Sequence, residues 1–328
     1  MYKKTATPLI LTLLLVMSLV LGACSSANKS ASGSGQPDTA GQADANASAG
    51  TKKVDTVFGE VEIPLQPKRI VALDYLSAVV SLGLKPVGAP QYFIDNPYLG
   101  DKTAGIESVG DWEPSIEKII ALSPDLILTF NNDQNAYESY SKIAPTIVVP
   151  YNTYKNAHEE IEGLGEMLGR EKEAKAWLEE YDRRVEAARA KLNGVIGPEE
   201  TFTLMSIDEK KMNLFADNYG RGGQAIYNVL QLTPPEIIKN EIFGDTQVKS
   251  LSLETVSQYA GDHIFLSIPK EKMGYQGDQI WQSLEAVKNN RVYELDNDRY
   301  YYYDPAAVIG QAEEIADLLV ERNSNQAE

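Results

Sequence analysis

The sequence predicts an α/β fold of two Rossmann-like lobes joined by one long, rigid α-helix. The first observation is an alternation of apolar, strand-like runs and short helical segments through residues 69–150. The second is an uninterrupted helical pattern over residues 170–193, and the third is a segment that occurs once on each side of that helix. Alternating strands and helices are typical of parallel sheets that are covered by helices.

The first half is expected to form such a parallel sheet. The alternating segment Val57–Ile63 predicts a hairpin strand at the start of the folded body, which we place near Val54. The runs that follow predict four strands, at 69–74, 85–89, 125–130 and 146–150, and three helices, at 75–82, 115–122 and 134–143.

A long helix is predicted over residues 170–193, which contain no Gly or Pro. Apolar residues recur every three or four positions from Ala174 to Leu192, so one face of the helix is apolar. At 1.5 Å per residue this helix would be about 36 Å long, roughly the width of a small domain. We interpret it as a rigid strut between an N-terminal lobe, residues 54–169, and a C-terminal lobe, residues 194–328. A covering helix of one large domain is the alternative.

The second half is expected to restart the α/β pattern. It predicts strands at 201–207, 212–216, 263–268 and 291–295, and helices at 223–230, 252–259 and 306–322.

One segment is repeated in the two halves. Ser115–Leu128 aligns without a gap with Ser252–Phe265, and the Ser, Glu and Asp positions coincide. Each copy predicts a Ser-capped helix, a turn at Pro or Gly, and an Asp that enters a buried strand. Glu117 and Glu254 fall in the first helical turn, where the helix dipole favours an acid. Alternatively, they present one acid per lobe to a two-fold partner.

Residues 1–23 have the pattern of a lipoprotein signal peptide. The apolar run Leu9–Leu21 follows two lysines and is too short to span a bilayer comfortably. Leu-Gly-Ala-Cys at residues 21–24 resembles a bacterial lipobox, which implies cleavage before Cys24 and lipidation of that residue. An ordinary signal peptide with an incidental cysteine is the alternative. Residues 24–53 then form the lipidated Cys and a disordered tether that is rich in Ala, Ser and Gly.

The composition argues against several function classes. The formal net charge of −17 disfavours binding to nucleic acid or anionic lipid headgroups. Only His158 and His263 are available as histidine ligands, too few for a typical zinc or manganese site. The neighbouring acids Asp111 and Glu113 are accompanied by no Gly-x-Ser-x-Gly elbow or Gly-x4-Gly-Lys phosphate loop. An exported hydrolase is therefore the weaker alternative, and we do not expect an enzyme.

Together these features resemble the siderophore-binding lipoproteins of iron-uptake ABC transporters. The motif Ser-Ile-Glu-Lys-Ile-Ile-Ala-Leu-Ser-Pro-Asp-Leu-Ile, which begins at Ser115, is highly typical of that family, and the likeness covers about Val54 to Leu319. It implies a monomeric receptor on the outer face of the cell membrane, with the lipid on Cys24 as its only anchor. It also implies that Glu117 and Glu254 dock onto arginines of a permease dimer that works with an ATPase.

The same resemblance implies a ligand cleft between two lobes that move little, no cofactor, and iron held by the siderophore. Asn218–Gly223 resembles the Trp-Gly-Arg segment of hydroxamate-siderophore binders, with Tyr219 in place of the Trp and Arg221 in place of the Arg that hydrogen-bonds hydroxamate oxygens. Tyr301–Pro305 resembles a Trp-Tyr-Asn-Asp-Pro segment, in which the Tyr aligned with Tyr302 contacts ligand. The further candidates are Tyr301 and residues in loops after the N-terminal strands, namely Tyr75, Tyr92, Trp112 and Asn131.

The charges of the candidate loops favour a hydroxamate ligand. Ferric tris-catecholates are strongly anionic, and comparable binders use clusters of Arg and Lys, whereas ferric tris-hydroxamates are nearly neutral. The candidate loops offer Arg221 and Arg299, and the chain has 18 Tyr, which suits a near-neutral ligand rich in oxygen. Lys210 and Lys211 leave a catecholate open, and haem or cobalamin on the same fold is a further alternative.

Overall fold

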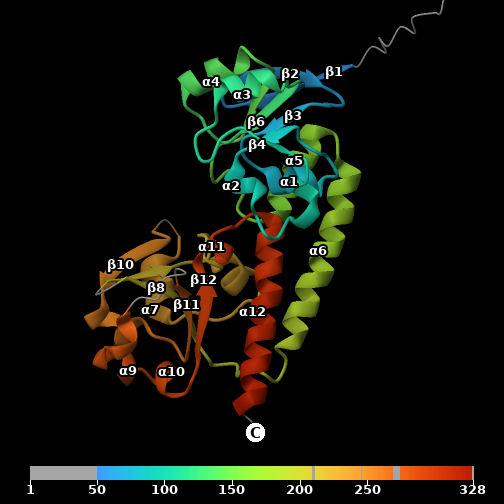
Figure 1. The fold of residues 1–328 in the computed structure, drawn as a ribbon. Coiled ribbons are helices and arrows are strands. Elements are labelled where there is room, and N and C mark those ends of the chain that lie inside the picture. Colours follow the sequence, from blue (N-terminus) through green and yellow to red (C-terminus); the bar gives the residue numbers. More distant parts are fainter. Residues whose placement is uncertain (1–49, 209–210, 245, 269–273, 327–328) are drawn as a thin grey trace, which may run out of the picture. The chain divides into compact units, whose positions relative to one another are not determined.

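The computed structural model of this 328-residue protein describes residues 50–208, 211–244, 246–268 and 274–326 (Figure 1). These residues belong to one compact unit, Ser48–Glu328. The predicted signal peptide, Cys24 and almost all of the predicted tether lie outside the described residues. None of the helices within the described ranges combines the length and the apolar character needed to cross a membrane.

The described chain begins with an antiparallel hairpin of β1 (Thr51–Thr56) and β2 (Gly59–Pro64). The prediction of one strand over 57–63 is wrong at its start, because Val57 and Phe58 form the turn and Gly59 has a φ of 97°. A glycine adopts this conformation without the steric penalty that a side chain would bring. The first strand also begins three residues before Val54, in sequence that reads as part of the tether.

The N-lobe, residues 51–168, contains the predicted parallel sheet, with the strand order β5-β4-β3-β6-β7. Its strands are β3 (Ile70–Ala72), β4 (Gly88–Ala89), β5 (Glu107–Ser108), β6 (Leu126–Thr129) and β7 (Thr146–Val148). Its helical elements are α1 (Leu76–Ser81), α2 (Gln91–Ile94), η1 (Gly100–Thr103), α3 (Ile116–Ala121), α4 (Gln134–Ser141) and α5 (Ala157–Leu168). β5, α2, η1 and α5 were not predicted. The central strands β3 and β6 are buried along their whole length, as expected of a sheet that is covered on both faces.

The C-lobe, residues 202–326, contains a mixed sheet with the order β10-β9-β8-β11-β12. Its strands are β8 (Phe202–Asp208), β9 (Lys211–Phe215), β10 (Val248–Ser252), β11 (His263–Ile268) and β12 (Val292–Asp296). β11 runs parallel to β8 and β12, whereas β9 runs antiparallel to β8 and β10. Its helical elements are η2 (Gln224–Val229), α7 (Glu236–Ile242), η3 (Leu253–Thr255), α8 (Val256–Tyr259), η4 (Gly274–Gly277), α9 (Gln279–Ser283), α10 (Glu285–Lys288), α11 (Asn297–Tyr300) and α12 (Pro305–Gln326). The predicted helix at 223–230 is a π-helix, in which the amide of Leu230 donates to the carbonyl of Ala225.

The long helix α6 (Glu171–Lys191) connects the lobes by packing into the core of each. Ala174 and Leu178 belong to the hydrophobic core of the N-lobe, whereas Val185 and Ala188 belong to that of the C-lobe. Burial of both halves of one helix fixes it to both lobes, which supports the strut interpretation.

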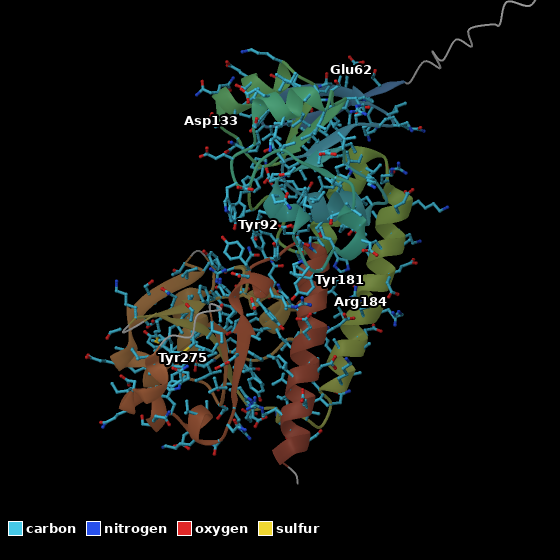
Figure 2. The ribbon with its side chains drawn as sticks, viewed as in Figure 1. Glu62, Tyr92, Asp133, Tyr181, Arg184 and Tyr275 are labelled. Carbon is cyan, nitrogen blue, oxygen red and sulfur yellow. The ribbon has the colours of Figure 1, made fainter. Side chains whose placement is uncertain are left out.

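The strut has a second helix beside it, which the sequence analysis did not anticipate. α12 runs alongside α6 and also contacts α1 of the N-lobe (Figure 1). Arg184 of α6, which Figure 2 labels, donates through Nε to the Glu313 carboxylate of α12 at 2.8 Å. Two turns further along α6, Lys191 pairs with Asp317 of α12. The closing helix is therefore part of the connection between the lobes and not only a cover of the C-lobe.

The repeated segment forms the same unit in both lobes. Asp125, which precedes β6, accepts hydrogen bonds from the amides of Lys68 and Arg69 at 2.7 and 2.9 Å. Asp262, which precedes β11, accepts from the amide and the hydroxyl of Thr201, each at 2.8 Å. In each lobe the Asp is thus bonded to the residue just before the neighbouring first strand, β3 or β8.

Candidate functional site

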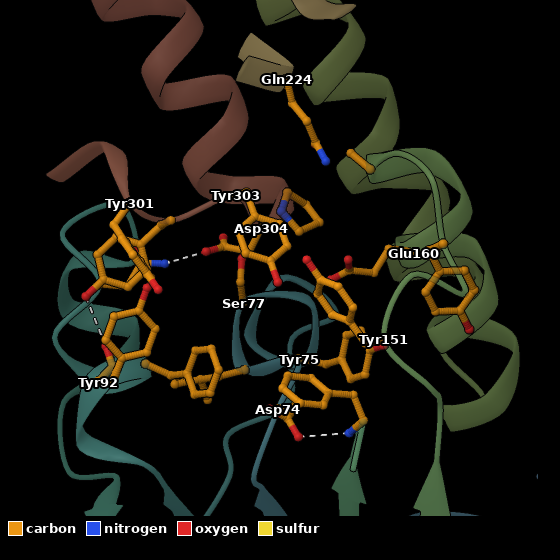
Figure 3. A pocket seen from close by; sticks show the side chains of 18 of the residues that line it. Asp74, Tyr75, Ser77, Tyr92, Tyr151, Glu160, Gln224, Tyr301, Tyr303 and Asp304 are labelled. Atoms are coloured by element: carbon orange, nitrogen blue, oxygen red, sulfur yellow. Dashed lines mark hydrogen bonds between the residues drawn. The ribbon is translucent and has the colours of Figure 1, made fainter. Parts of the chain in front are cut away.

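A cavity of about 300 Å³ lies between the lobes and is lined by residues of both (Figure 3). Most of its wall comes from the N-lobe, from loops after the strands and from the start of α5. The C-lobe contributes Asn218, Gln224 and the segment 301–305. The size and the mixture of aromatic and polar groups suit the binding of a small molecule.

A stack of aromatic rings from both lobes forms one wall of the cavity. The Tyr92 ring stacks on Trp112 with 4.3 Å between ring centroids, and on Tyr302 with 4.8 Å. The hydroxyl of Tyr302 also donates a hydrogen bond to the carbonyl oxygen of Tyr92 at 3.0 Å. Trp112 is 67% exposed, so a large apolar face is open at the rim of the cavity. Figure 2 shows Tyr92 where the two lobes meet.

Tyr75 forms part of the opposite wall and is fixed by its backbone and its hydroxyl. It precedes α1 with a φ of 59°, a left-handed conformation that is uncommon for a residue with a side chain. Its hydroxyl donates to the carbonyl oxygen of Val149 at 3.0 Å. Burial, followed by the charge of Glu160, raises the pKa of Tyr75, so its hydroxyl stays protonated and can act as a donor.

Three carboxyl groups line the cavity, and two of them accept hydrogen bonds. Asp74 accepts from the Thr129 hydroxyl and the Phe130 amide, each at 2.8 Å, and burial raises its pKa to about 6. Asp304 accepts from the Asn96 side chain at 2.7 Å, and burial raises its pKa as well.

Glu160 is the third of these carboxyl groups. Burial and the nearby charge of Asp304 raise the pKa of Glu160 to about 8. Figure 3 shows its side chain directed from α5 into the cavity, on the side of Tyr75.

Two candidates of the C-lobe, Arg221 and Tyr219, are not among the residues that line the cavity. The Arg221 guanidinium carbon lies 4.4 Å from the ring centroid of Tyr301, which does line it. Tyr219 stacks on Phe215, with 5.7 Å between centroids. A Cβ on Gly220 would lie 2.5 Å from the Tyr301 carbonyl oxygen, so only glycine allows these two segments to touch.

The structure therefore brings Tyr75, Tyr92, Trp112, Tyr301 and Tyr302 together around one cavity. Asn131 does not line it, because its side chain turns back to accept from the Asp133 amide at 3.0 Å.

Other residues that line the cavity were not predicted from the sequence, among them Tyr151, Tyr154, Glu160, Tyr303 and Asp304. The Asn156 side chain caps α5 by accepting a hydrogen bond from the Glu159 amide at 3.0 Å, so the sequence signals the start of this helix but not the position of Glu160 in the cavity.

The two candidate docking acids are exposed and lie outside the cavity. Each is in the first turn after a serine cap, Glu117 in α3 and Glu254 in η3. Hydrogen bonds from its backbone amide and from Ser115 lower the pKa of Glu117, so it is charged at neutral pH. In the described ranges, no group of three or more His, Cys, Asp or Glu side chains is placed to hold a metal ion.

The chain is similar in sequence to known proteins. The profile of a family described as periplasmic binding proteins matches residues 70–299. The iron(3+)-hydroxamate-binding protein YxeB of Bacillus subtilis is 36% identical over 271 residues, which cover 80% of this chain and 84% of YxeB. The iron(3+)-hydroxamate-binding protein FhuD of the same organism is 34% identical over 268 residues, with the same shares covered.

Solved structures share the fold as well. A Bacillus subtilis FhuD-fold protein, described as the periplasmic binding component of a Fep/Fec-like ferrichrome ABC transporter, superposes with a TM-score of 0.74 at 34% identity and covers 82% of this chain and 100% of its own. FhuD2 of Staphylococcus aureus, solved with bound ferrioxamine B, gives a TM-score of 0.68 at 28% identity, with 78% and 100% covered.

Proposed function

Because the chain belongs to the periplasmic binding protein family and is a substrate-binding transport protein, we propose that it captures ferric hydroxamate siderophores for an ABC importer. The observation that carries this proposal is the likeness to two iron(3+)-hydroxamate-binding proteins over 80% of the chain. The protein holds and releases its ligand, and no bond of the ligand is made or broken.

The chemistry of the cavity supports the same ligand class. Of the described residues that line it, none is Lys, Arg or His, so an anionic ferric catecholate would meet no compensating charge there. A ferric tris-hydroxamate is neutral at its iron centre and offers the carbonyl oxygens and the N–O oxygens of its hydroxamate groups. Tyrosine hydroxyls and amide groups such as those of Asn218 and Gln224 can donate to these oxygens, and the aromatic rings pack against the linkers of the siderophore.

A ligand titration tests the proposal through Trp112, which is exposed at the rim of the cavity. We expect ferrioxamine B to quench tryptophan fluorescence with a dissociation constant of about 1 μM or below. A ferric catecholate and haem should bind far more weakly. Trp112→Phe should remove most of the signal, since Trp281 is buried in the C-lobe and Trp177 lies on α6. Tight binding of the catecholate or haem alone would overturn the hydroxamate assignment.

We further propose that lipid on Cys24 anchors the receptor to the outer face of the cell membrane, and that Glu117 and Glu254 dock it onto a permease dimer. The lipoprotein names of related ABC substrate-binding proteins support the anchor. The docking role is supported by two exposed acids that occupy matching positions in a unit repeated once per lobe.

The docking proposal is tested by the double variant Glu117→Ala, Glu254→Ala. We expect siderophore-dependent iron uptake by cells to fall about tenfold or more, with unchanged ligand affinity of the purified protein. Glu171→Ala with Glu236→Ala is the matched control, because these acids are exposed and lie in the first turns of α6 and α7. Normal uptake by the double variant would contradict the docking role, and lost affinity would assign the acids to the fold.

A further inference from the structure

We propose that Glu160 provides an anionic subsite for a positively charged group of the ligand, so that the receptor prefers ferric hydroxamates that carry a protonated amine. This inference rests on the proposed function and narrows its substrate class.

The charges around the cavity are unbalanced. Its described lining includes the carboxyl groups of Asp74, Glu160 and Asp304, and it includes no basic side chain. Arg221 lies against the Tyr301 ring and Arg299 pairs with Glu314, and neither belongs to the lining. A ligand that brings a positive charge would therefore complete the charge balance of the cavity, whereas an anionic ligand would worsen it.

Glu160 differs from the other two acids in its hydrogen bonds. Asp74 is bonded by Thr129 and Phe130, and Asp304 by Asn96 and by the Ala307 amide at 3.1 Å. No donor in the described part of the chain bonds to the Glu160 carboxylate, and burial, followed by the charge of Asp304, raises its pKa. A partly buried carboxylate without donors is costly to keep charged, and an ammonium group supplies both the charge and the donors that it lacks.

The placement of Glu160 suits a ligand group and not a structural ion pair. It lies in the first turn of α5, where its backbone amide donates to the Asn156 carbonyl at 3.2 Å, so the backbone position is fixed. Figure 3 shows its side chain directed into the cavity. Tyr154 lines the same cavity, and its hydroxyl is buried beside Gly163 of α5 with no hydrogen-bond partner among the described residues. Aromatic faces beside an acid are a favourable environment for an ammonium group.

The subsite has a defined dependence on pH. The titratable groups that face Glu160 are Asp304 and the hydroxyls of Tyr75, Tyr154 and Tyr303, and burial raises the pKa of all of them. The tyrosines stay neutral below pH 9, and an aliphatic amine with a pKa of about 10.4 stays protonated. A bound ammonium favours ionised Glu160, whose pKa in the free protein is about 8. Affinity for a cationic ligand should therefore rise between pH 6 and pH 8.5.

The experiment compares two ligands and three proteins by calorimetry. Ferrioxamine B carries one protonated amine, and its N-acetyl derivative has the same ferric tris-hydroxamate without that charge. The proteins are the wild type, Glu160→Gln, and the matched control Glu162→Gln, which makes the same charge change at an exposed position in the same helix. Comparing the ligand preference between proteins cancels the effect of the acetyl group's size.

We expect the wild type to bind ferrioxamine B about tenfold more tightly than the acetylated ligand at pH 8.5, with a smaller preference at pH 6. Glu160→Gln should lose the preference and its pH dependence, and Glu162→Gln should keep both. A preference that survives in Glu160→Gln, or equal affinities in the wild type, would overturn the subsite and leave the proposed function intact. If neither ligand binds the wild type, the proposed function itself fails.

Discussion

The N-lobe and the C-lobe are built on the same helix–turn–strand unit, yet the N-lobe supplies most of the cavity wall. All strands of the N-lobe sheet run parallel, so the loops that follow them open at one edge, where Tyr75, Tyr92 and Phe130 line the cavity. The C-lobe sheet has an antiparallel edge, β9 and β10, and among the described residues this lobe lines the cavity through residues in 218–224 and 301–305. The edge that faces the cavity therefore depends on parallel strand order and not on the repeated unit alone.

The strand registers locate the chemical difference between the lobes. Ala72 of β3 pairs with Leu128, and Leu204 of β8 pairs with Phe265, so these two positions correspond. Two residues further on, the N-lobe has the buried acid Asp74, whereas the C-lobe has the uncharged Ser206. At this corresponding position the N-lobe therefore has an ionisable group and the C-lobe does not.

The largest effect that we predict is a pH dependence of stability that comes from Asp74. Because burial raises its pKa from 3.8 to about 6, the folded state binds the proton more tightly than the unfolded state. The share of the free energy of unfolding that comes from Asp74 should therefore fall by roughly 2.5 kcal/mol as pH rises from about 4 to 7. Asp74→Asn should remove this share and leave the fall that comes from Glu160 and Asp304, whose pKa values burial also raises, as urea titrations at pH 4, 5.5 and 7 can measure.

Ser206→Ala is the control for the C-lobe and should leave the pH dependence of the wild type in place. Parallel pH profiles for Asp74→Asn and the wild type would show that Asp74 is not the source of the difference between the lobes.

A smaller loss of stability, equal in the two lobes, is expected when either of the repeated aspartates is replaced. Asp125→Ala and Asp262→Ala each leave backbone amides before β3 or β8 without their acceptor, and each should lower the free energy of unfolding by about 2 kcal/mol. Urea unfolding at pH 7 measures both, with the exposed loop residue Asp111→Ala as a neutral control. A loss confined to one lobe would mean that the repeated unit is not equally important in the two.

The smallest predicted effect is on ligand affinity, and it compares one aromatic residue from each lobe. Trp112→Ala in the N-lobe removes a ring that lines the cavity and should weaken ferrioxamine B binding about tenfold. Tyr219→Ala in the C-lobe removes a ring outside the lining and should change affinity by no more than about twofold. Calorimetry gives both values. A tenfold loss on Tyr219→Ala would place the Tyr219 ring itself against the ligand.

The parallel sheet of the N-lobe could be predicted because its strands are short apolar runs between clear turn residues. Other elements carry a weaker pattern. β10 is an edge strand with exposed and half-buried side chains, so Val248–Ser252 shows no apolar run. α5 contains Gly163 and Gly165, which disfavour a helix in the sequence but are needed because Tyr154 and Ala174 pack against them.

The site was predictable where aromatic residues follow strands and less so where tertiary packing decides. Tyr75 directly precedes α1 and Tyr92 lies in the short helix α2, and the position of both follows from the parallel strands before them. Arg221 does not line the cavity, because its guanidinium group packs against the ring of Tyr301, which does line it. The sequence does not indicate this packing. Glu160 reaches the cavity because α5 folds back beside α1, which the local sequence does not indicate.

The tyrosines of the cavity are oriented by the main chain of their neighbours. Tyr75 bonds to the carbonyl of Val149, and Tyr302 bonds to the carbonyl of Tyr92. Every residue type offers a carbonyl group, so substitutions at the accepting positions leave these ring orientations in place as long as the backbone keeps its course. The residues that supply these carbonyl groups can therefore change during evolution without altering the shape of the cavity. The side chains that contact the ligand can change independently of them.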